Sequence, residues 1–433
     1  VMNGGDFRSA ELWDYLNDAG QTVGVVNMPT MYPPRAIDGF VVCGGPDAVE
    51  GEYRSIDSGY THPPELEARL ERTYDYRVHP NPLLSSNSER GEEVDEILRL
   101  IETRFRVAVD LFEEEDLDLV HVTLFYLNVL QHFFWDDEPT RRAWAIVDEW
   151  LGRIADLEDT NLIVMSDHGC APTRAEFYVN EWLAREGYLS EKRNVDDVLA
   201  MVGLHRERVL AVAKRLGLVD VLSRTVPQRL QKLVPQAAGA KRERKLEKID
   251  LERTSAVASG QGPIYLNRDL DDGTLRERLI DDLRDVRDAD GEPLFSDVHR
   301  GEELYSGPYV DLGPEIVVDQ RPGIHVNDGL GGGTVLSDPD RWAAENTPTG
   351  IFVANGPDVE PRGEIEDIRI VDIAPTILAG AGLDVPSDMD GRVLPIFTEE
   401  PDVGTRSPLP FERREGDRFD EVADRLADLG DME

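Results

Sequence analysis

The sequence predicts an α/β fold in which helices cover both faces of a mainly parallel sheet. Short, unbroken apolar runs such as 161–165 (NLIVM) alternate with amphipathic runs such as 92–115, as in sheets that are buried on both faces. The chain has 433 residues, of which 40% are hydrophobic, so it can bury a substantial core.

The first part of the chain supplies most of this alternation. Apolar residues at intervals of three and four predict helices, and unbroken apolar runs predict strands. Along 92–115, for example, Val94, Ile97, Leu98 and Ile101 fall on one helical face. We expect helices at 11–17, 92–115 and 141–157, and strands at 22–28, 37–42, 119–127 and 161–165.

A second set of elements follows a segment of different composition. Residues 191–253 are helical in pattern and contain all the lysines of the chain, which marks them as a helical insert or cap. Asp372 and Gly382 are placed to begin and to end a later helix. Beyond the insert we expect strands at 256–267, 315–319 and 350–354, and a helix at 373–381.

These elements divide the chain into four parts. The last part is rich first in proline and then in acidic residues, which is typical of a surface tail. We assign the first part of the core to 1–190, the helical insert to 191–253, the second part of the core to 254–398 and the acidic tail to 399–433.

The net charge is the most unusual property of the composition. The chain has 87 Asp and Glu against 46 Lys and Arg, which gives −41. Because the acidic residues are spread over every segment, we interpret the charge as adaptation to molar salt, as in halophilic archaea. The charge argues against nucleic-acid binding. No apolar run approaches the ~20 residues of a membrane helix, and the start shows no signal-peptide pattern, so we expect a cytoplasmic protein.

Two polar clusters follow predicted strands, at the edge where doubly wound sheets bind ligands. Asn128 and His132 lie four residues apart, so a helix would place them on one face. Asp167 and His168 directly follow the next strand and could hold one divalent cation or bridge two. The alternatives are a structural histidine and a simple turn, but two clusters on separate strands of one sheet favour a site. The neutral carbonyl of asparagine suits Mg or Mn better than Zn.

Several segments resemble the type I phosphodiesterase/nucleotide pyrophosphatase family of the alkaline phosphatase superfamily. NLIVMSDHGCAPTRAEFYVNEWLAREGYL (161–189) is similar to the family's SDHG…NEWL…GYL block, and NVLQHFFWDD (128–137) to its Asp-x-x-x-His-Phe-Phe-Trp block. The segment 12–45 resembles the one that follows the family's nucleophile. With two later landmarks, at 250–267 and 372–394, these matches cover most of the chain outside the insert.

The resemblance implies a three-layer α/β/α sandwich of the alkaline phosphatase type. It also implies two bridged divalent metals, usually zinc, and a metal-bound Thr or Ser as nucleophile. One cation would turn that hydroxyl into an alkoxide, and the other would stabilise the leaving oxygen. By position, Asp167 and His168 each match a ligand of the two metals, and His132 matches a third ligand.

The sequence departs from the family's pattern at three places. Asn128 stands where the family has a ligating Asp, and Asn346 stands where its His-x-Pro-x-Gly block has a ligating His. Neither asparagine carries a charge, so both departures should weaken a metal site. The family's opening strand, with its Asp-Gly ligand, and the nucleophile have no counterpart here. Thr30 and Ser166 are hydroxyl side chains, but neither lies in the nucleophile's context.

The insert suggests a further hypothesis about binding. Residues 208–236 are basic and amphipathic in an otherwise acidic chain, so they could contact an anionic membrane surface, a partner or a phosphorylated substrate. The alternative is a helical cap with a solvated face.

Two functions are consistent with these observations. The first is hydrolysis of phosphodiester or phosphomonoester bonds in a small substrate, with a divalent metal (Zn, or Mn or Mg) as cofactor. Because the nucleophile segment has no counterpart, we expect this chain to be inactive and to belong to a longer protein that begins before Val1. The second is a non-catalytic binding or scaffold protein on the same fold. The substrate depends on loops that fold-level reasoning does not read.

Overall fold

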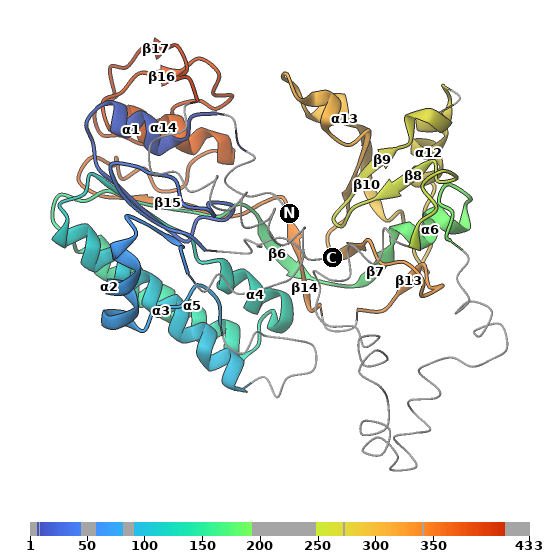
Figure 1. The fold of residues 1–433 in the computed structure, drawn as a ribbon, viewed down its shortest axis with the longest axis horizontal. Helices are drawn as coiled ribbons and strands as arrows, with labels where there is room; N and C mark the ends of the chain where they lie inside the picture. Colours follow the sequence, from blue (N-terminus) through green and yellow to red (C-terminus); the bar gives the residue numbers. More distant parts are fainter. Residues whose placement is uncertain are drawn as a thin grey trace, which may run out of the picture. The chain divides into compact units, whose positions relative to one another are not determined.

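The computed structural model describes residues 7, 9–44, 58–80, 91–192, 248–271, 273–339 and 342–411. The chain divides into two compact units, which are drawn in Figure 1. The first unit comprises 1–50, 54–172 and 340–433, and the second comprises 51–53 and 173–339. Both units contain helices and strands, which confirms the mixed α/β class.

The two units do not follow the boundaries that we expected from the sequence. Residues 173–190 and 254–339, which we assigned to the two parts of the core, belong to the second unit. Most of the predicted insert (193–247) and of the acidic tail (412–433) lies outside the described residues. The four-part division therefore stays a prediction.

The first unit contains a four-stranded sheet with the order β3-β2-β1-β4. β1 pairs in parallel with β2 and β4, and β3 forms an antiparallel edge. The central strand β1 is fully buried, which explains its unbroken VGVV run. Gly39 begins β2 with φ +127°, and a Cβ there would lie 2.1 Å from the carbonyl oxygen of Val23. The strands are β1 (Val23–Val26), β2 (Gly39–Val42), β3 (Thr61–His62) and β4 (Leu119–Val122).

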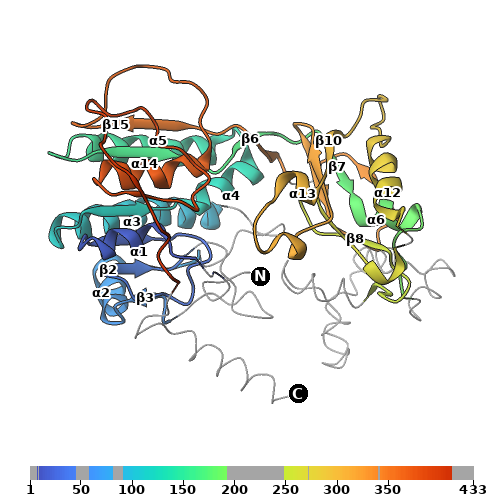
Figure 2. The ribbon, with the colours of Figure 1, turned by 90° about the horizontal axis from the view of Figure 1, so that it is seen from above.

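Helices accompany this sheet in the first unit. The long helix α3 lies beside α5, and α1 lies beside α14 (Figures 1 and 2). Phe105 of α3 stacks on Trp150 of α5 with ring centroids 5.9 Å apart. None of the helices that the structure describes is long and apolar enough to span a membrane. The helices are α1 (Leu12–Asp18), α2 (Glu65–Tyr74), α3 (Gly91–Glu114), α4 (Phe125–Phe134), α5 (Glu138–Ala155), the 3-10 helix η4 (Ile370–Asp372) and α14 (Ile373–Gly380).

The strand predicted at 119–127 is wrong in its second half. The strand ends at Val122, and α4 begins at Phe125. A short apolar run fits either a strand or a buried helix. The second half of this run is helical because the side chains of Tyr126 and Leu130 are buried in one cluster with side chains of α3 and α5. Asn128 and His132 therefore both lie inside a helix, one turn apart.

The other strands of the first unit form two-stranded pairs. β5 (Leu162–Met165) pairs with β15 (Phe352–Asn355), and β6 (Gly169–Pro172) pairs with β14 (Ala344–Thr347), both antiparallel. The remaining pair, β16 (Val385–Pro386) with β17 (Thr405–Arg406), is parallel. The prediction of a mainly parallel sheet thus holds for β2, β1 and β4 and is wrong for β5.

The second unit contains two sheets, in which every pair is antiparallel except the parallel pair of β12 and β7. One sheet has the order β10-β11-β9-β8, and another has the order β12-β7-β13. Phe177 is fully buried and meets Phe295 edge to face at 5.6 Å. The single strand predicted at 256–267 is a hairpin of β8 and β9, with Gly262 at φ +111° in its turn. The elements are β7 (Ala175–Tyr178), α6 (Val179–Arg185), β8 (Ala256–Ala258), β9 (Pro263–Leu266), η2 (Arg268–Leu270), α12 (Leu275–Arg284), β10 (Phe295–Arg300), α13 (Gly301–Leu304), η3 (Val310–Leu312), β11 (Ile316–Gln320), β12 (Ile324–Asn327) and β13 (Leu336–Ser337).

Candidate functional site

The pairing of β6 with β14 brings two of the sequence blocks together in the first unit. In this antiparallel ribbon Asn346 faces Cys170, and Thr347 faces Gly169. The helix α4 contacts β14. The block around His132, the block around Asn346 and the residues after His168 therefore meet on one ribbon, although they come from distant parts of the chain.

His132 is held against β14 by its ring and by its backbone. Its side chain is buried, and Nδ1 lies 2.8 Å from the carbonyl oxygen of Ala344. A carbonyl oxygen only accepts, so Nδ1 donates, and Nε2 is the nitrogen that could coordinate a metal. The ring stacks on Trp342 with centroids 4.0 Å apart and an interplanar angle of 21°. The amide of Ala343 also donates to the carbonyl oxygen of His132, at 2.6 Å.

Asp167 and His168 lie in the turn between β5 and β6, and their side chains are in contact. Nε2 of His168 is 3.5 Å from Oδ2 of Asp167, and its Nδ1 donates to the carbonyl oxygen of Gly169 at 2.8 Å. The side chain of Asp167 is 76% exposed, against 24% for His168. Gly169 allows the backbone of Thr349 to approach closely, because a Cβ there would lie 2.0 Å from the carbonyl oxygen of Thr349.

Asn346 carries a buried polar atom without a partner. Its Oδ1 is buried and makes no hydrogen bond with any described residue. An unsatisfied buried carbonyl costs about 1–3 kcal/mol, so a water, a cation or a ligand donor would stabilise it. An asparagine amide can also turn over and present its N–H₂ group at the same place. Asn128 lies one turn before His132 on α4 and is half-buried.

Sequence reasoning missed the polar residues that surround Asn346. The carboxylate of Glu345 is buried, accepts from the indole N–H of Trp342 at 2.8 Å and accepts from the amide of Asn346 at 3.1 Å. Burial and this carboxylate raise the pKa of the Cys170 thiol to about 11, so the thiol stays protonated. The only signal in the sequence was the position of Glu345 inside the block that contains Asn346.

The two hydroxyl side chains that the sequence offers are bonded to nearby backbone. Oγ of Ser166 accepts from the amide of Ile351 at 2.8 Å, and Oγ1 of Thr30 donates to the carbonyl oxygen of Pro29 at 2.6 Å. Ser166 thus joins the end of β5 to the chain just before β15. This contact gives Ser166 a structural role.

The donors of this region do not fit a centre of two metals. In the part of the chain that the structure describes, no three His, Cys, Asp or Glu side chains lie close enough together to hold a metal ion. The sequence predicts five ligand positions, and two of them, Asn128 and Asn346, are neutral asparagines. A third, His168, is paired with Asp167. The assignment of these five positions to one metal site stays a prediction, and we derive no reaction step through a metal.

Comparisons with known proteins place the chain in a family. The model of the family described as type I phosphodiesterase/nucleotide pyrophosphatase matches residues 2–331, which is more than half of the chain. Two crystal structures of phosphonoacetate hydrolase from Sinorhizobium meliloti 1021, with phosphonoformate and with phosphonoacetate, are similar to it at 15% identity and a TM-score of 0.44. Each match covers 84% of this chain and 72% of the other. A search of curated proteins gives no match. The chain therefore belongs to the type I phosphodiesterase/nucleotide pyrophosphatase family of the alkaline phosphatase superfamily.

Proposed function

We propose that this chain binds a phosphorylated small molecule at the ribbon of β6 and β14 and does not hydrolyse it. The observation that carries the proposal is the buried, unsatisfied amide oxygen of Asn346. Where the family has a metal-ligating imidazole, an amide can meet a ligand directly, as an acceptor or, turned over, as a donor to a phosphate oxygen. Family membership supports the class of ligand, because the hydrolases of this family act on phosphate esters.

The loss of one carboxylate ligand and one imidazole ligand supports the absence of hydrolysis. A two-metal mechanism needs anionic or imidazole ligands that hold both cations against their hydration. Asn128 and Asn346 supply neither a charge nor an imidazole. Of the ligands that the family resemblance implies, the described residues retain only His132, Asp167 and His168. Ala344 and Trp342 hold the ring of His132 in place.

The proposal predicts binding without turnover. In molar KCl, calorimetric titration with AMP should show binding, and bis-p-nitrophenyl phosphate should not be hydrolysed. The substitution Asn346→Leu should weaken binding by about tenfold, which corresponds to the loss of one hydrogen bond. Asn355→Leu, on the neighbouring strand pair, is the matched control and should bind as the parent does.

Hydrolysis is the second candidate, and the pair of Asp167 and His168 at the end of β5 favours it. In this case divalent zinc, manganese or magnesium would assist cleavage of a phosphodiester or phosphomonoester. Hydrolysis that Asp167→Ala abolishes would establish this candidate and refute the first. No binding of AMP and no hydrolysis would refute both.

Several finer features remain parts of the proposal. We propose the three-layer α/β/α arrangement of the superfamily, an origin in a halophilic archaeon and a cytoplasmic location, on the evidence of the family and of the net charge of −41. The basic segment 208–236 lies outside the described residues, and its contact with a membrane or a partner also stays a proposal.

A further inference from the structure

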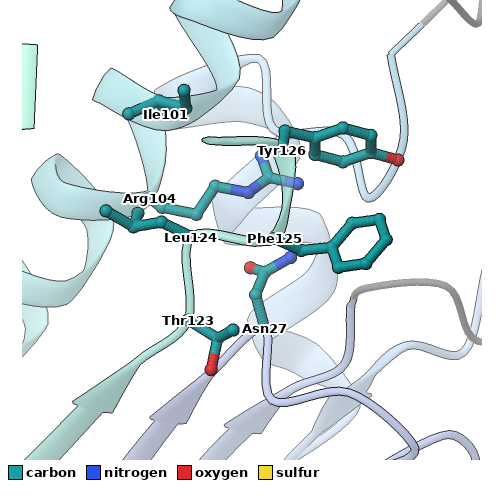
Figure 3. Close-up of a pocket in the computed structure, with 7 residues that line it drawn as sticks. All are labelled: Asn27, Ile101, Arg104, Thr123, Leu124, Phe125 and Tyr126. Carbon is teal, nitrogen blue, oxygen red and sulfur yellow. The ribbon is translucent and has the colours of Figure 1, made fainter. Parts of the chain in front are cut away.

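A small pocket lies at the carboxyl ends of β1 and β4, two neighbouring parallel strands (Figure 3). This edge of a parallel sheet is where open α/β folds bind ligands. The pocket is small, with a volume of about 10 Å³. It is lined by Asn27, Ile101, Arg104, Thr123, Leu124, Phe125 and Tyr126. The pocket lies at the start of α4 and is distinct from the ribbon of β6 and β14.

Arg104 brings a buried positive charge to this pocket. The residue is only 3% exposed. Its guanidinium donates to the carbonyl oxygens of Arg77 and Val78, at 2.9 and 2.7 Å, and lies 4.9 Å from the centre of the Tyr76 ring. It forms no ion pair with any described residue. Carbonyl dipoles and a ring face reduce the cost of a buried charge but do not neutralise it.

Asn27 adds a hydrogen-bond donor that has no acceptor. The residue is 2% exposed and follows β1 with φ 61°, a conformation that asparagine tolerates. Its Oδ1 accepts from the hydroxyl of Tyr76, which fixes the amide so that Nδ2 is its other polar atom. Nδ2 donates to no described residue and lies against Gly44, where a Cβ would be 1.9 Å away, and Asn27 is one of the residues that line the pocket in Figure 3.

The start of α4 is the third feature of the pocket that attracts an anion. The first amide groups of a helix have no acceptor within the helix, and the dipole makes that end positive. The N-cap residue is Leu124, and no side chain in the described part of the chain caps α4. Thr123 does not cap it either, because its hydroxyl points away from the pocket in Figure 3 and pairs with Nε2 of His121 at 3.0 Å.

We propose that this pocket binds a chloride ion. The guanidinium of Arg104, Nδ2 of Asn27 and the amides that begin α4 are all donors, and none of the described residues that line the pocket carries a carboxylate. The apolar walls from Ile101 and Phe125 lower the local dielectric and strengthen the attraction of an anion. The small volume excludes a phosphate group, so an anion bound here would be monatomic.

The direct test uses bromide as the probe. A crystal of the full chain soaked in sodium bromide should give an anomalous peak in the pocket, in contact with Arg104 and Nδ2 of Asn27. The variant Asn27→Asp keeps an oxygen for Tyr76 and puts a carboxylate where the anion would lie, so its peak should be lost. A water instead of bromide in the parent, or a peak that persists in Asn27→Asp, overturns the proposal.

A measurement in solution tests the same proposal without crystals. Replacing methanesulfonate by chloride at constant ionic strength should raise the Tm of the parent by a few degrees, because chloride binds the folded state only. Asn27→Asp should show no chloride response, because it carries its own anion. Arg106→Met removes an exposed arginine of the same helix and should respond as the parent does. Equal responses in the parent and Asn27→Asp contradict the proposal.

Discussion

We expect the substitution Arg35→Met to lower the free energy of unfolding of the first unit by about 3–5 kcal/mol. The guanidinium of Arg35 is 4% exposed and bonds to both carboxylate oxygens of Asp14, at 3.1 Å each, and to Glu11 at 2.6 Å. Removal of the arginine takes this cation away from two neighbouring carboxylates, the buried Asp14 and Glu11, whose side chain is 20% exposed. Burial already raises the pKa of Glu11 against the opposing effect of Arg35, so loss of the arginine would raise it further.

The free energy of unfolding is measured by denaturant titration in molar KCl. The control is a variant of an exposed ion pair. Arg153 pairs with Glu149 at 2.6 Å on the surface of α5, with side chains 57% and 65% exposed. Arg153→Met should cost less than about 1 kcal/mol. If Arg35→Met costs no more than Arg153→Met, the cluster of Arg35, Asp14 and Glu11 does not stabilise the unit as we describe.

We expect His121 to make the first unit sensitive to acid between pH 6.5 and about 4. Burial lowers the pKa of its imidazole from 6.5 to about 4 in the folded chain. The unfolded chain therefore binds a proton in this range that the folded chain does not. The stabilisation is complete above pH 6.5 and is lost as the pH falls towards 4. The loss amounts to roughly 2–3 kcal/mol, since the residue retains some exposure to solvent.

The comparison is between the parent and His121→Gln, whose side chain does not titrate. Across this pH range the variant should lose roughly 2–3 kcal/mol less than the parent, with the other acidic groups cancelling in the difference. Thr123→Val removes the hydrogen bond to His121 and leaves the imidazole buried, so it should keep the acid sensitivity of the parent. Parallel curves for the parent and His121→Gln would contradict this account.

The strength of the local pattern decides which elements the sequence predicts well. The apolar stripe of α3 is long and regular, and the helix predicted at 92–115 spans Gly91–Glu114. The run LVHVTLFYL has no period to separate a strand from a buried helix, so the start of α4 was not predictable from it. The antiparallel partner of β5 was equally hidden, because pairing depends on β15, far away in the sequence.

The candidate site shows the same division between local and long-range information. The sequence blocks identify His132, Asp167, His168 and the two asparagines by their neighbours along the chain. They cannot show that His132 stacks on Trp342 or bonds to Ala344, which is 212 residues away. Those contacts depend on the pairing of β6 with β14 and on the packing of α4 against β14. The unsatisfied oxygen of Asn346 follows from the same packing.

Calorimetric titration with Mn²⁺ in molar KCl tests most directly whether Asn128 and Asn346 deprive the site of its metal. The double variant Asn128→Asp/Asn346→His returns a carboxylate and an imidazole to the neighbourhood of His132, and Asn355→Asp controls for the added charge. We predict at least about tenfold tighter binding for the double variant than for the parent and for Asn355→Asp. Tight binding of two ions per chain by the parent, or no gain in the double variant, would contradict this account.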